Sequence, residues 1–197
     1  MIIDLTKKFL EIQAFKPPIL GKYHISGLWG VLNHYDTVQQ FVKGKAINFP
    51  TALKMKMGTL KHQLCQECLE GWELEKKIEF KIPNTNITLI GKCDAIKGNT
   101  ILEIKTSDHL ISEAKRWHIW QIKMYLSMFN VENGIILQPI VKNGLFLKSI
   151  GEVKKNDTWF KKQLELIHKL HLEAVQFGVL PCQNQTNSNL NVPSIKS

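Results

Sequence analysis

The sequence contains no long apolar run, little arginine and few cysteines. No segment approaches the roughly 20 consecutive apolar residues that a membrane-spanning helix needs, so we expect no membrane partner. The first residues lack the basic region and apolar stretch of a secretory signal, which predicts a cytoplasmic protein, or one in the host cytoplasm if the source is a virus. The four cysteines, at positions 65, 68, 93 and 182, are therefore expected to be reduced thiols.

Positive charge is what the sequence has in excess, and nearly all of it comes from lysine. The 26 lysine and arginine residues outnumber the 17 aspartate and glutamate residues, which gives a formal net charge of +9. Arg116 is the only arginine. A basic surface attracts polyanions and accelerates their encounter, so nucleic acid is the expected partner. An anionic membrane, or a charge that serves solubility alone, is the alternative.

Length and composition predict one folded domain. A chain of 197 residues with 44% hydrophobic and 22% charged residues suits a single globular domain with its own core. We expect this domain over residues 1–182, with an N-terminal helical part at 1–50, a core at 51–150 and a C-terminal helix at 157–178. The tail at 183–197 is rich in Asn, Gln and Ser and is expected to be disordered.

Hydrophobic periodicity predicts alternating helices and strands. Before residue 51 we expect a short helix within 1–22 and a second helix from a Ser26 cap towards Phe41. The pattern then predicts a helix, three strands, a helix, two strands and a helix, at 51–74, 77–82, 87–96, 100–106, 107–129, 134–141, 145–150 and 157–178. This order is typical of an α/β fold with a mixed central β-sheet flanked by helices.

Caps and apolar faces predict where the helices begin and which side they bury. Ser107 or Asp108 is the expected cap of helix 107–129, and Asp157 and Gly178 are the expected cap and stop of the last helix. Helix 51–74 carries apolar residues near helical spacing at Leu53, Met57, Leu60, Leu64 and Leu69. The last helix is expected to bury Phe160, Leu164, Ile167, Leu170 and Val175.

A hairpin between the second and third strands places two carboxylates together. If Gly98-Asn99 is its two-residue loop, Lys97 faces Thr100. Asp94 then lies opposite Glu103, and both side chains point to one face of the sheet. If the loop is one residue longer, this register fails.

The same register sorts the neighbouring side chains. Lys105 lies two residues beyond Glu103 and shares its face, opposite Lys92, whereas Leu102 and Ile104 point into the core. A passive surface would instead pair carboxylates with lysines across the strands.

Opposed carboxylates are destabilising unless something compensates their repulsion. A divalent cation does so, and magnesium favours carboxylate oxygens together with water and substrate phosphate. A lysine beside the cation can orient or deprotonate an attacking water and offset developing charge. Asp94, Glu103 and Lys105 therefore form a candidate catalytic site for metal-assisted hydrolysis.

These residues resemble the pattern of the PD-(D/E)xK nucleases, in which an Asp on one strand precedes Glu-x-Lys on the next. The sequence matches it at Asp94 and at Glu103-Ile104-Lys105. Three further segments resemble motifs of the RecB-like branch in the expected order: a helical Gly-Thr-x-x-His at Gly58–His62, a Gly-x-x-Asp at Gly91–Asp94 and a Gln-x-x-x-Tyr at Gln121–Tyr125. The resemblance covers about residues 50–140 and implies a restriction-endonuclease-like αβββαβ core.

The resemblance also implies roles for the matching residues. Mg²⁺ or Mn²⁺ is expected to be held by His62, Asp94, Glu103 and the backbone carbonyl of Ile104, while Lys105 positions the attacking water. Without the resemblance, a single histidine on a helix would be taken as a surface or core residue.

Several residues of helix 107–129 are expected to contact nucleic acid. Gln121 and Tyr125 lie at i and i+4 on one helix face, and the resemblance places them near the metal. Simple packing is their alternative role. Lys115 and Arg116 are ordinary solvated charges by default and phosphate contacts by position.

The cysteines depart from the pattern of those RecB-like nucleases that carry an iron–sulfur cluster. No cysteine precedes position 65 and only Cys182 follows the last helix, so we predict no cluster. Cys65 and Cys68 alone do not supply the four ligands of a zinc site. Cys93 is expected to point into the core.

The sequence therefore predicts a Mg²⁺- or Mn²⁺-dependent deoxyribonuclease that acts as an exonuclease on single-stranded DNA or DNA ends. A catalytically silent nucleic-acid-binding protein and a sequence-specific endonuclease are the alternatives. DNA versus RNA, cleavage polarity and a homo-oligomeric state stay open, as does the choice among DNA repair or recombination, CRISPR adaptation and a viral role.

Overall fold

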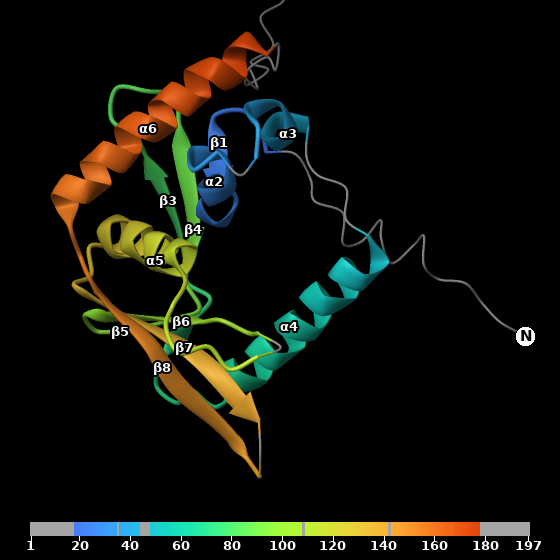
Figure 1. The fold of residues 1–197 in the computed structure, drawn as a ribbon. Coiled ribbons are helices and arrows are strands. Elements are labelled where there is room, and N and C mark those ends of the chain that lie inside the picture. The colour runs from blue at the N-terminus through green and yellow to red at the C-terminus, as the bar shows by residue number, and fades with distance from the viewer. Residues whose placement is uncertain (1–17, 35, 44–47, 108, 142, 178–197) are drawn as a thin grey trace, which may run out of the picture.

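Two mixed β-sheets flanked by helices make up the structure, a computed structural model (Figure 1). It describes residues 18–34, 36–43, 48–107, 109–141 and 143–177. The α/β class with mixed sheets flanked by helices, predicted from the sequence, is confirmed. Most of the predicted first helix, Asp108, the Gly178 stop, Cys182 and the tail lie outside the described residues.

The strands divide between a five-stranded and a three-stranded sheet. The larger has the order β2-β5-β6-β7-β8, formed by Glu73–Leu74, Ala95–Lys97, Thr100–Ile104, Asn133–Val141 and Leu145–Lys154. The smaller has the order β1-β4-β3, formed by Lys22–His24, Thr88–Lys92 and Lys77–Lys81. Figure 1 places the smaller sheet above α5 (Arg116–Phe129) and the larger one below it.

The predicted single strand 87–96 is two strands that belong to different sheets. β4 ends at Lys92 and β5 begins at Ala95, so Cys93-Asp94 is the crossing point. The predicted register of the β5–β6 hairpin is confirmed, because Lys97 pairs with Thr100. The pairing of Lys92 with Lys105 is wrong: Lys92 pairs with Lys77 in the smaller sheet.

The N-terminal region differs from its prediction. Residues 18–22 are not helical, and β1 pairs in parallel with β4, burying Tyr23. A strand of three residues is too short to show a clear alternation. The helix expected from Ser26 to Phe41 is divided into α2 (Ile25–Leu32), which begins after His24, and α3 (Val38–Lys43).

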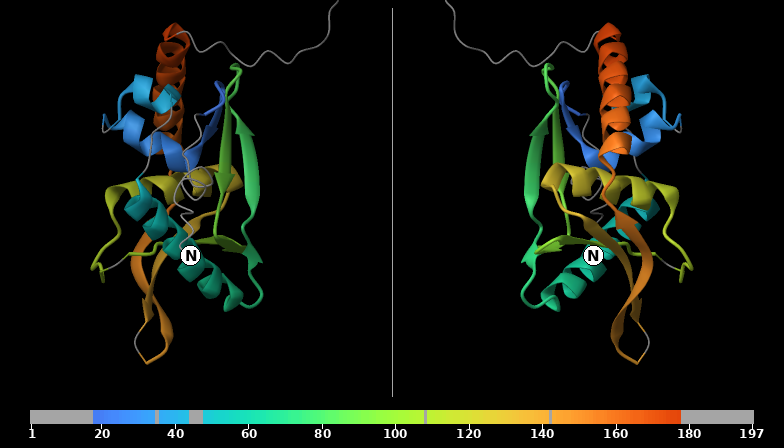
Figure 2. Two further views of the ribbon diagram at one scale, coloured as in Figure 1. Left: turned by 90° about the vertical axis from the view of Figure 1, so that its right-hand side faces the viewer. Right: turned by 90° about the vertical axis from the view of Figure 1, so that its left-hand side faces the viewer.

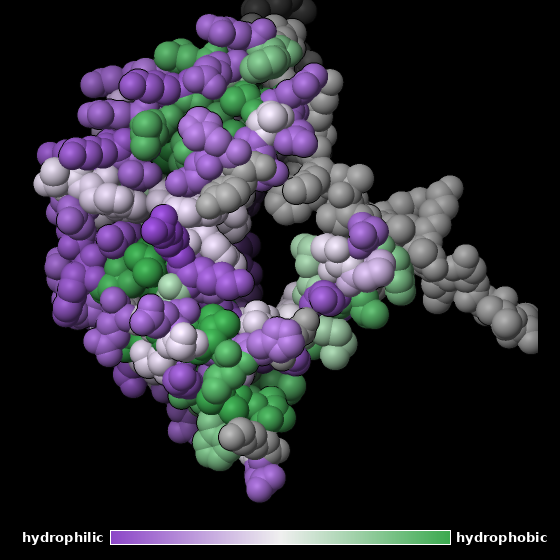
Figure 3. Space-filling view, in the orientation of Figure 1, coloured by the Kyte–Doolittle hydropathy of each residue, from purple (hydrophilic) through white to green (hydrophobic). Residues whose placement is uncertain are grey.

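Helix α4 (Phe49–Glu67) is capped by Asn48, whose side chain accepts a hydrogen bond from the Thr51 amide at 3.0 Å. It ends before the predicted residue 74, with Cys68 as its C-cap, and Gly71 then adopts a left-handed φ of 73° on the way into β2. The apolar residues that the sequence places at helical spacing along α4 are exposed, by 44%, 49%, 43% and 56% at Leu53, Met57, Leu60 and Leu64. Figure 1 shows α4 projecting from the body, Figure 2 shows the β7–β8 hairpin extending below α5, and Figure 3 shows a hollow between α4 and the body.

Helix α5 begins at Arg116, later than predicted, and neither Ser107 nor Asp108 is its cap. The described residues before it are irregular, and the buried Gln138 side chain accepts a hydrogen bond from the Ile111 amide and donates one to the His109 carbonyl. A third bond joins the Ala114 amide to the Ile150 carbonyl. Tertiary partners satisfy this backbone, so it has no need of helical hydrogen bonds.

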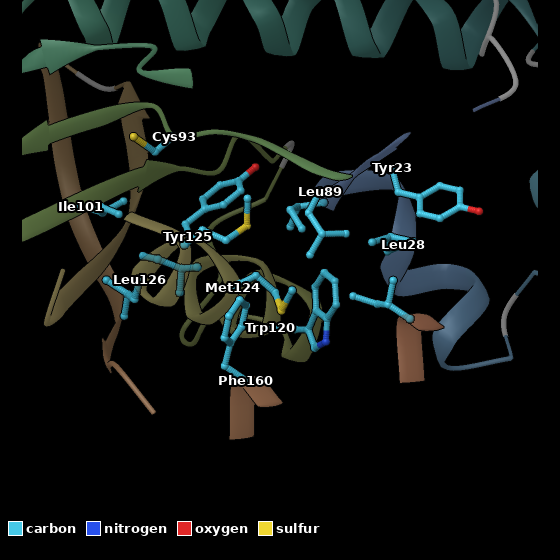
Figure 4. Packing of buried hydrophobic residues seen from close by; sticks show 14 of the residues in the cluster. Tyr23, Leu28, Leu89, Cys93, Ile101, Trp120, Met124, Tyr125, Leu126 and Phe160 are labelled. Carbon is cyan, nitrogen blue, oxygen red and sulfur yellow. The ribbon is translucent and has the colours of Figure 1, made fainter. Parts of the chain in front are cut away.

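The core surrounds α5, which contacts both sheets as well as α2 and α6 (Asp157–Gln176). Figure 4 shows Trp120, Met124, Tyr125 and Leu126 of this helix packed among Leu28, Leu89, Ile101 and Phe160. Helix α6 is capped by Asn156, and Asp157 is its first residue instead of the predicted cap.

Helix α6 buries most of the predicted apolar face. Phe160, Ile167 and Leu170 are buried and Leu164 is partly buried, whereas Val175 is 40% exposed near the C-terminal end. Among the described residues, no helix has both the length and the apolar character needed to cross a membrane.

Candidate active site

Asp94 is fixed at the point where the chain passes from one sheet to the other. Its Oδ2 accepts a hydrogen bond from the Ile104 amide at 2.6 Å and lies 2.7 Å from Nε2 of His62. Its backbone carbonyl accepts from Nε2 of Gln66 and from the Glu75 amide, both at 3.0 Å. The carboxylate is thereby held between β6 and α4 although Asp94 itself lies outside a strand.

His62 reaches Asp94 because α4 approaches the end of β6 closely. A Cβ atom on Gly58 would lie 2.9 Å from Oγ1 of Thr106, so this position of the helix has little room for a side chain. Burial lowers the pKa of His62, but the hydrogen bond and charge of Asp94 outweigh it and raise the pKa above its ordinary value. The structure thus gives the Gly-Thr-x-x-His segment a physical reason for its glycine.

Glu103 is 1% exposed and carries an incompletely satisfied carboxylate. Its Oε2 lies 2.8 Å from Nζ of Lys105, whereas Oε1 is buried without a hydrogen-bond partner among the described residues. Burial raises the pKa of Glu103, and the nearby Lys105 ammonium offsets only part of that effect. The alternation of β6 places both side chains on one face, as the sequence predicts.

Lys105 is positioned by two residues of α5. Its Nζ donates to Oε1 of Gln121 at 2.9 Å, and Nε2 of Gln121 donates to the Tyr125 hydroxyl at 2.9 Å. Tyr125 packs over Gly91, where an added Cβ would lie 3.1 Å from the tyrosine ring. Gln121 and Tyr125 are only 7% and 3% exposed, so their visible contacts are with this internal network. Their contact with nucleic acid stays a prediction.

The remaining predicted residues lie around this cluster. Ile104 is buried and its amide holds Asp94, while the role of its carbonyl stays a prediction. Lys115 precedes α5 and Arg116 opens it; both are exposed. Trp117, which the sequence analysis overlooked, lies with its ring centroid 5.4 Å from Nζ of Lys105.

The ligands predicted for a divalent cation are close together but engaged with one another. Among the residues that the structure describes, no three His, Cys, Asp or Glu side chains form a preassembled metal centre. His62 bonds to Asp94, and Lys105 neutralises one oxygen of Glu103. The buried, unpartnered Oε1 of Glu103 and the carboxylate of Asp94 are nevertheless hard oxygen donors of the kind that Mg²⁺ and Mn²⁺ prefer, so the donor set fits such an ion.

The three cysteines that the structure describes show no sign of binding a metal ion. Cys93 is fully buried, as predicted, and burial raises the pKa of its thiol to about 12, which opposes formation of a metal-binding thiolate. Cys65 is buried, and the exposed Cys68 donates from Sγ to the Leu64 carbonyl. The predicted lack of an iron–sulfur cluster stays a prediction, since Cys182 lies outside the described part of the chain.

Comparison with solved structures shows what this fold is similar to. The crystal structure of SSO0001 aligns with a TM-score of 0.53 at 18% identity, covering 92% of this chain and 89% of that one. An alkaline exonuclease (LHK-Exo) from Laribacter hongkongensis aligns with a TM-score of 0.54 at 13% identity, covering 88% and 96%. LHK-Exo in complex with dAMP gives 0.55 at 13% identity, covering 87% and 96%. No family model and no curated protein matches the sequence.

These likenesses extend over nearly the whole of both chains, so they concern the complete fold. Identities of 13–18% establish a shared fold and no more. The mixed α/β architecture of this chain is therefore similar to that of an alkaline exonuclease.

His118 beside this site predicts a measurable pH dependence of stability. Burial, together with the positive charges of Lys105 and Lys115, lowers the pKa of His118 to about 4. In the unfolded chain His118 takes up a proton near pH 6.5, whereas in the folded chain it stays neutral until about pH 4. The free energy of unfolding should therefore fall as the pH drops from about 6.5 to about 4, by up to about 3 kcal/mol.

Urea unfolding across this pH range tests the prediction with His118→Asn. In the wild type, Nδ1 of His118 accepts a hydrogen bond from the Lys115 amide, and the asparagine side chain keeps an acceptor for it. The variant should show the shallower pH dependence, while His168→Asn on the exposed side of α6 should keep that of the wild type. Parallel curves for His118→Asn and wild type would contradict a neutral, buried His118.

Proposed function

We propose that this protein is a metal-dependent nuclease that hydrolyses DNA phosphodiester bonds at Asp94, Glu103 and Lys105. The observation that carries the proposal is the pair of buried carboxylates held beside one lysine, with Oε1 of Glu103 buried and without a hydrogen-bond partner in the part of the chain that the structure describes. An unsatisfied buried carboxylate oxygen is costly in a structural role and suits a ligand position.

His62, Asp94, Glu103 and the carbonyl of Ile104 are the residues that would hold Mg²⁺ or Mn²⁺. Such an ion supplies Lewis-acid activation of the phosphodiester and of a bound water. Asp94 is set in place by the Ile104 amide, so its carboxylate needs little reorganisation to take up this role. His62 would exchange its bond to Asp94 for the ion.

Lys105 is proposed to orient the attacking water and to offset charge as the phosphodiester is cleaved. A lysine ammonium has three N–H donors. Two of them are directed to Glu103 and Gln121, at 2.8 and 2.9 Å, and the third remains for water or a phosphate oxygen. The fixed geometry aims this charge at the substrate before the reaction begins.

Gln121 and Tyr125 are proposed as positioning residues in place of the nucleic-acid contacts first expected. Because their side chains are buried and bonded in series to Lys105, they control where the ammonium points. Their i, i+4 spacing on α5 supplies two successive supports from one rigid helix.

DNA is the proposed substrate, taken as a single strand or at an end, in the manner of an exonuclease of the RecB-like branch. The net charge of +9 favours a polyanion, and a solved structure of similar fold, an alkaline exonuclease, is described in complex with dAMP. A hollow lies beside α4 (Figure 3), and a pocket that Gly58 and Lys61 of α4 line together with Thr106 offers an approach for the strand.

Degradation of end-labelled single-stranded and duplex DNA tests the proposal. Cutting should require Mg²⁺ or Mn²⁺ and stop with EDTA, and Asp94→Ala and Lys105→Ala should each lower the rate at least about 100-fold, as for loss of a charge-stabilising group. Lys161→Ala, on the exposed face of α6, should cut like wild type. Binding without cutting by wild type, with either metal, would contradict the proposal and favour a silent binding protein.

Steady-state kinetics separate positioning from substrate contact at α5. Gln121→Leu and Tyr125→Phe should lower kcat, by about 10-fold or more for Gln121→Leu, and leave KM for DNA nearly unchanged, because the loss falls on the orientation of Lys105. A raised KM with unchanged kcat would show that these side chains bind DNA instead. Gln121→Asn should be less active than wild type, since the shorter side chain does not bring its amide within reach of Lys105.

A further inference from the structure

A small apolar pocket opens between α2 and the first turn of α5, beside the proposed active site. Trp29, Gly30, Arg116 and Trp117 line it, and it encloses about 390 Å³. Trp117 connects the pocket to the site, because the centroid of its ring is 5.4 Å from Nζ of Lys105. A group bound in this pocket would therefore be a close neighbour of whatever Lys105 contacts.

Both tryptophans that line the pocket are held in place by buried neighbours. The Trp29 ring lies 5.9 Å from that of Trp120, which is 5% exposed and donates from Nε1 to Gln163 at 2.9 Å. The Trp117 ring lies 3.8 Å from that of His118, which is 4% exposed. The pocket thus has preformed walls, and a ligand would bind with little loss of side-chain freedom.

The chemistry of the lining is unusual for a passive surface. Trp117 leaves 40% of its surface in water, and it shares the pocket with a second indole and with the only arginine of the chain. Single exposed tryptophans need no explanation, but two around one hollow leave apolar surface unburied. No carboxylate lines the pocket itself, and the nearby carboxylate of Asp36 lies against Gly30.

We propose that this pocket is a nucleobase subsite, in which the base of a nucleotide next to the scissile phosphate stacks on Trp117 and Trp29. Indole rings stack on the flat face of any base, and an arginine beside them binds the adjoining phosphate or stacks in turn. The charge suits a nucleotide, since Arg116 lines the pocket and Nζ of Lys105 lies 5.4 Å from the centroid of the Trp117 ring. This subsite rests on the proposed nuclease function, to which it adds recognition of the base.

The subsite sets a requirement on the substrate. A base inside a duplex is covered on both faces by its neighbours and has to leave the stack to enter such a pocket. The nucleotide bound at Trp117 must therefore be unpaired. Because stacking does not read hydrogen bonds, the pocket should accept any of the four bases with modest preference.

Binding without catalysis tests the subsite first. In EDTA, a labelled single-stranded thymidine oligonucleotide should bind Trp117→Ala and Trp29→Ala on the order of 10-fold more weakly than wild type, and Trp117→Phe should retain much of the affinity. Trp159→Ala, which removes a partly buried tryptophan of α6 outside the pocket, should bind like wild type once its folding is confirmed by thermal melting. Equal affinities of well-folded wild type and Trp117→Ala would overturn the subsite.

A single abasic position moved along the oligonucleotide then locates the base. In wild type one register near the cut should lower kcat/KM on the order of 10-fold, and Trp117→Ala should lose this sensitivity because the stacking partner is gone. If the abasic position lowers kcat/KM as much in Trp117→Ala as in wild type, the proposal is overturned. Failure of the nuclease function would appear separately, as tryptophan-dependent binding in EDTA with no cutting in either metal.

Discussion

The passage of the chain between the two sheets at Cys93-Asp94 is the constraint on which the candidate site depends. At this point the backbone leaves the smaller sheet and joins the larger one, so Asp94 itself lies outside a strand and takes no part in the strand pairing. Its Oδ2 accepts a hydrogen bond from the amide of Ile104 in β6 and also lies beside Nε2 of His62 in α4. A single carboxylate therefore ties a strand, a helix and a sheet crossing to one place. Because Ile104 lies between Glu103 and Lys105 in the sequence, its hydrogen bond to Asp94 also brings these two residues close to Asp94.

Burial gives the second carboxylate its chemical character. Burial raises the pKa of Glu103, and its Oε1, which has no hydrogen-bond partner among the described residues, is a position that a cation would satisfy. Lys105 balances part of the charge and is itself braced by Gln121 and Tyr125 on α5. The helix that organises the hydrophobic core thus also aligns the polar network. Because α5 supports both the core and the polar network, a substitution in it can change stability as well as activity. Its effect on each should be measured separately, by thermal melting and by kinetics.

Local rules in the sequence predicted the parts that local interactions determine. The Gly98-Asn99 turn and the alternation of β6 predicted the hairpin register and the shared face of Glu103 and Lys105. Nothing local signals that strand 87–96 changes sheets, because its apolar pattern runs through the crossing. The late start of α5 depends on Gln138, a tertiary partner. Trp117 was missed because a tryptophan at a helix start has no motif, and only the neighbouring Trp29 and Arg116 reveal a pocket.

Thermal unfolding with and without Mn²⁺, compared between wild type and Glu103→Gln, tests most directly the claim that the buried carboxylates form a cation site. An ion that binds only the folded state raises Tm, so the wild type should melt several degrees higher with Mn²⁺ in excess. Glu103→Gln removes the unsatisfied charge; it should melt at or above the metal-free wild type and respond little to the ion. An equal Mn²⁺ shift in both proteins, or no shift in wild type, would contradict the account.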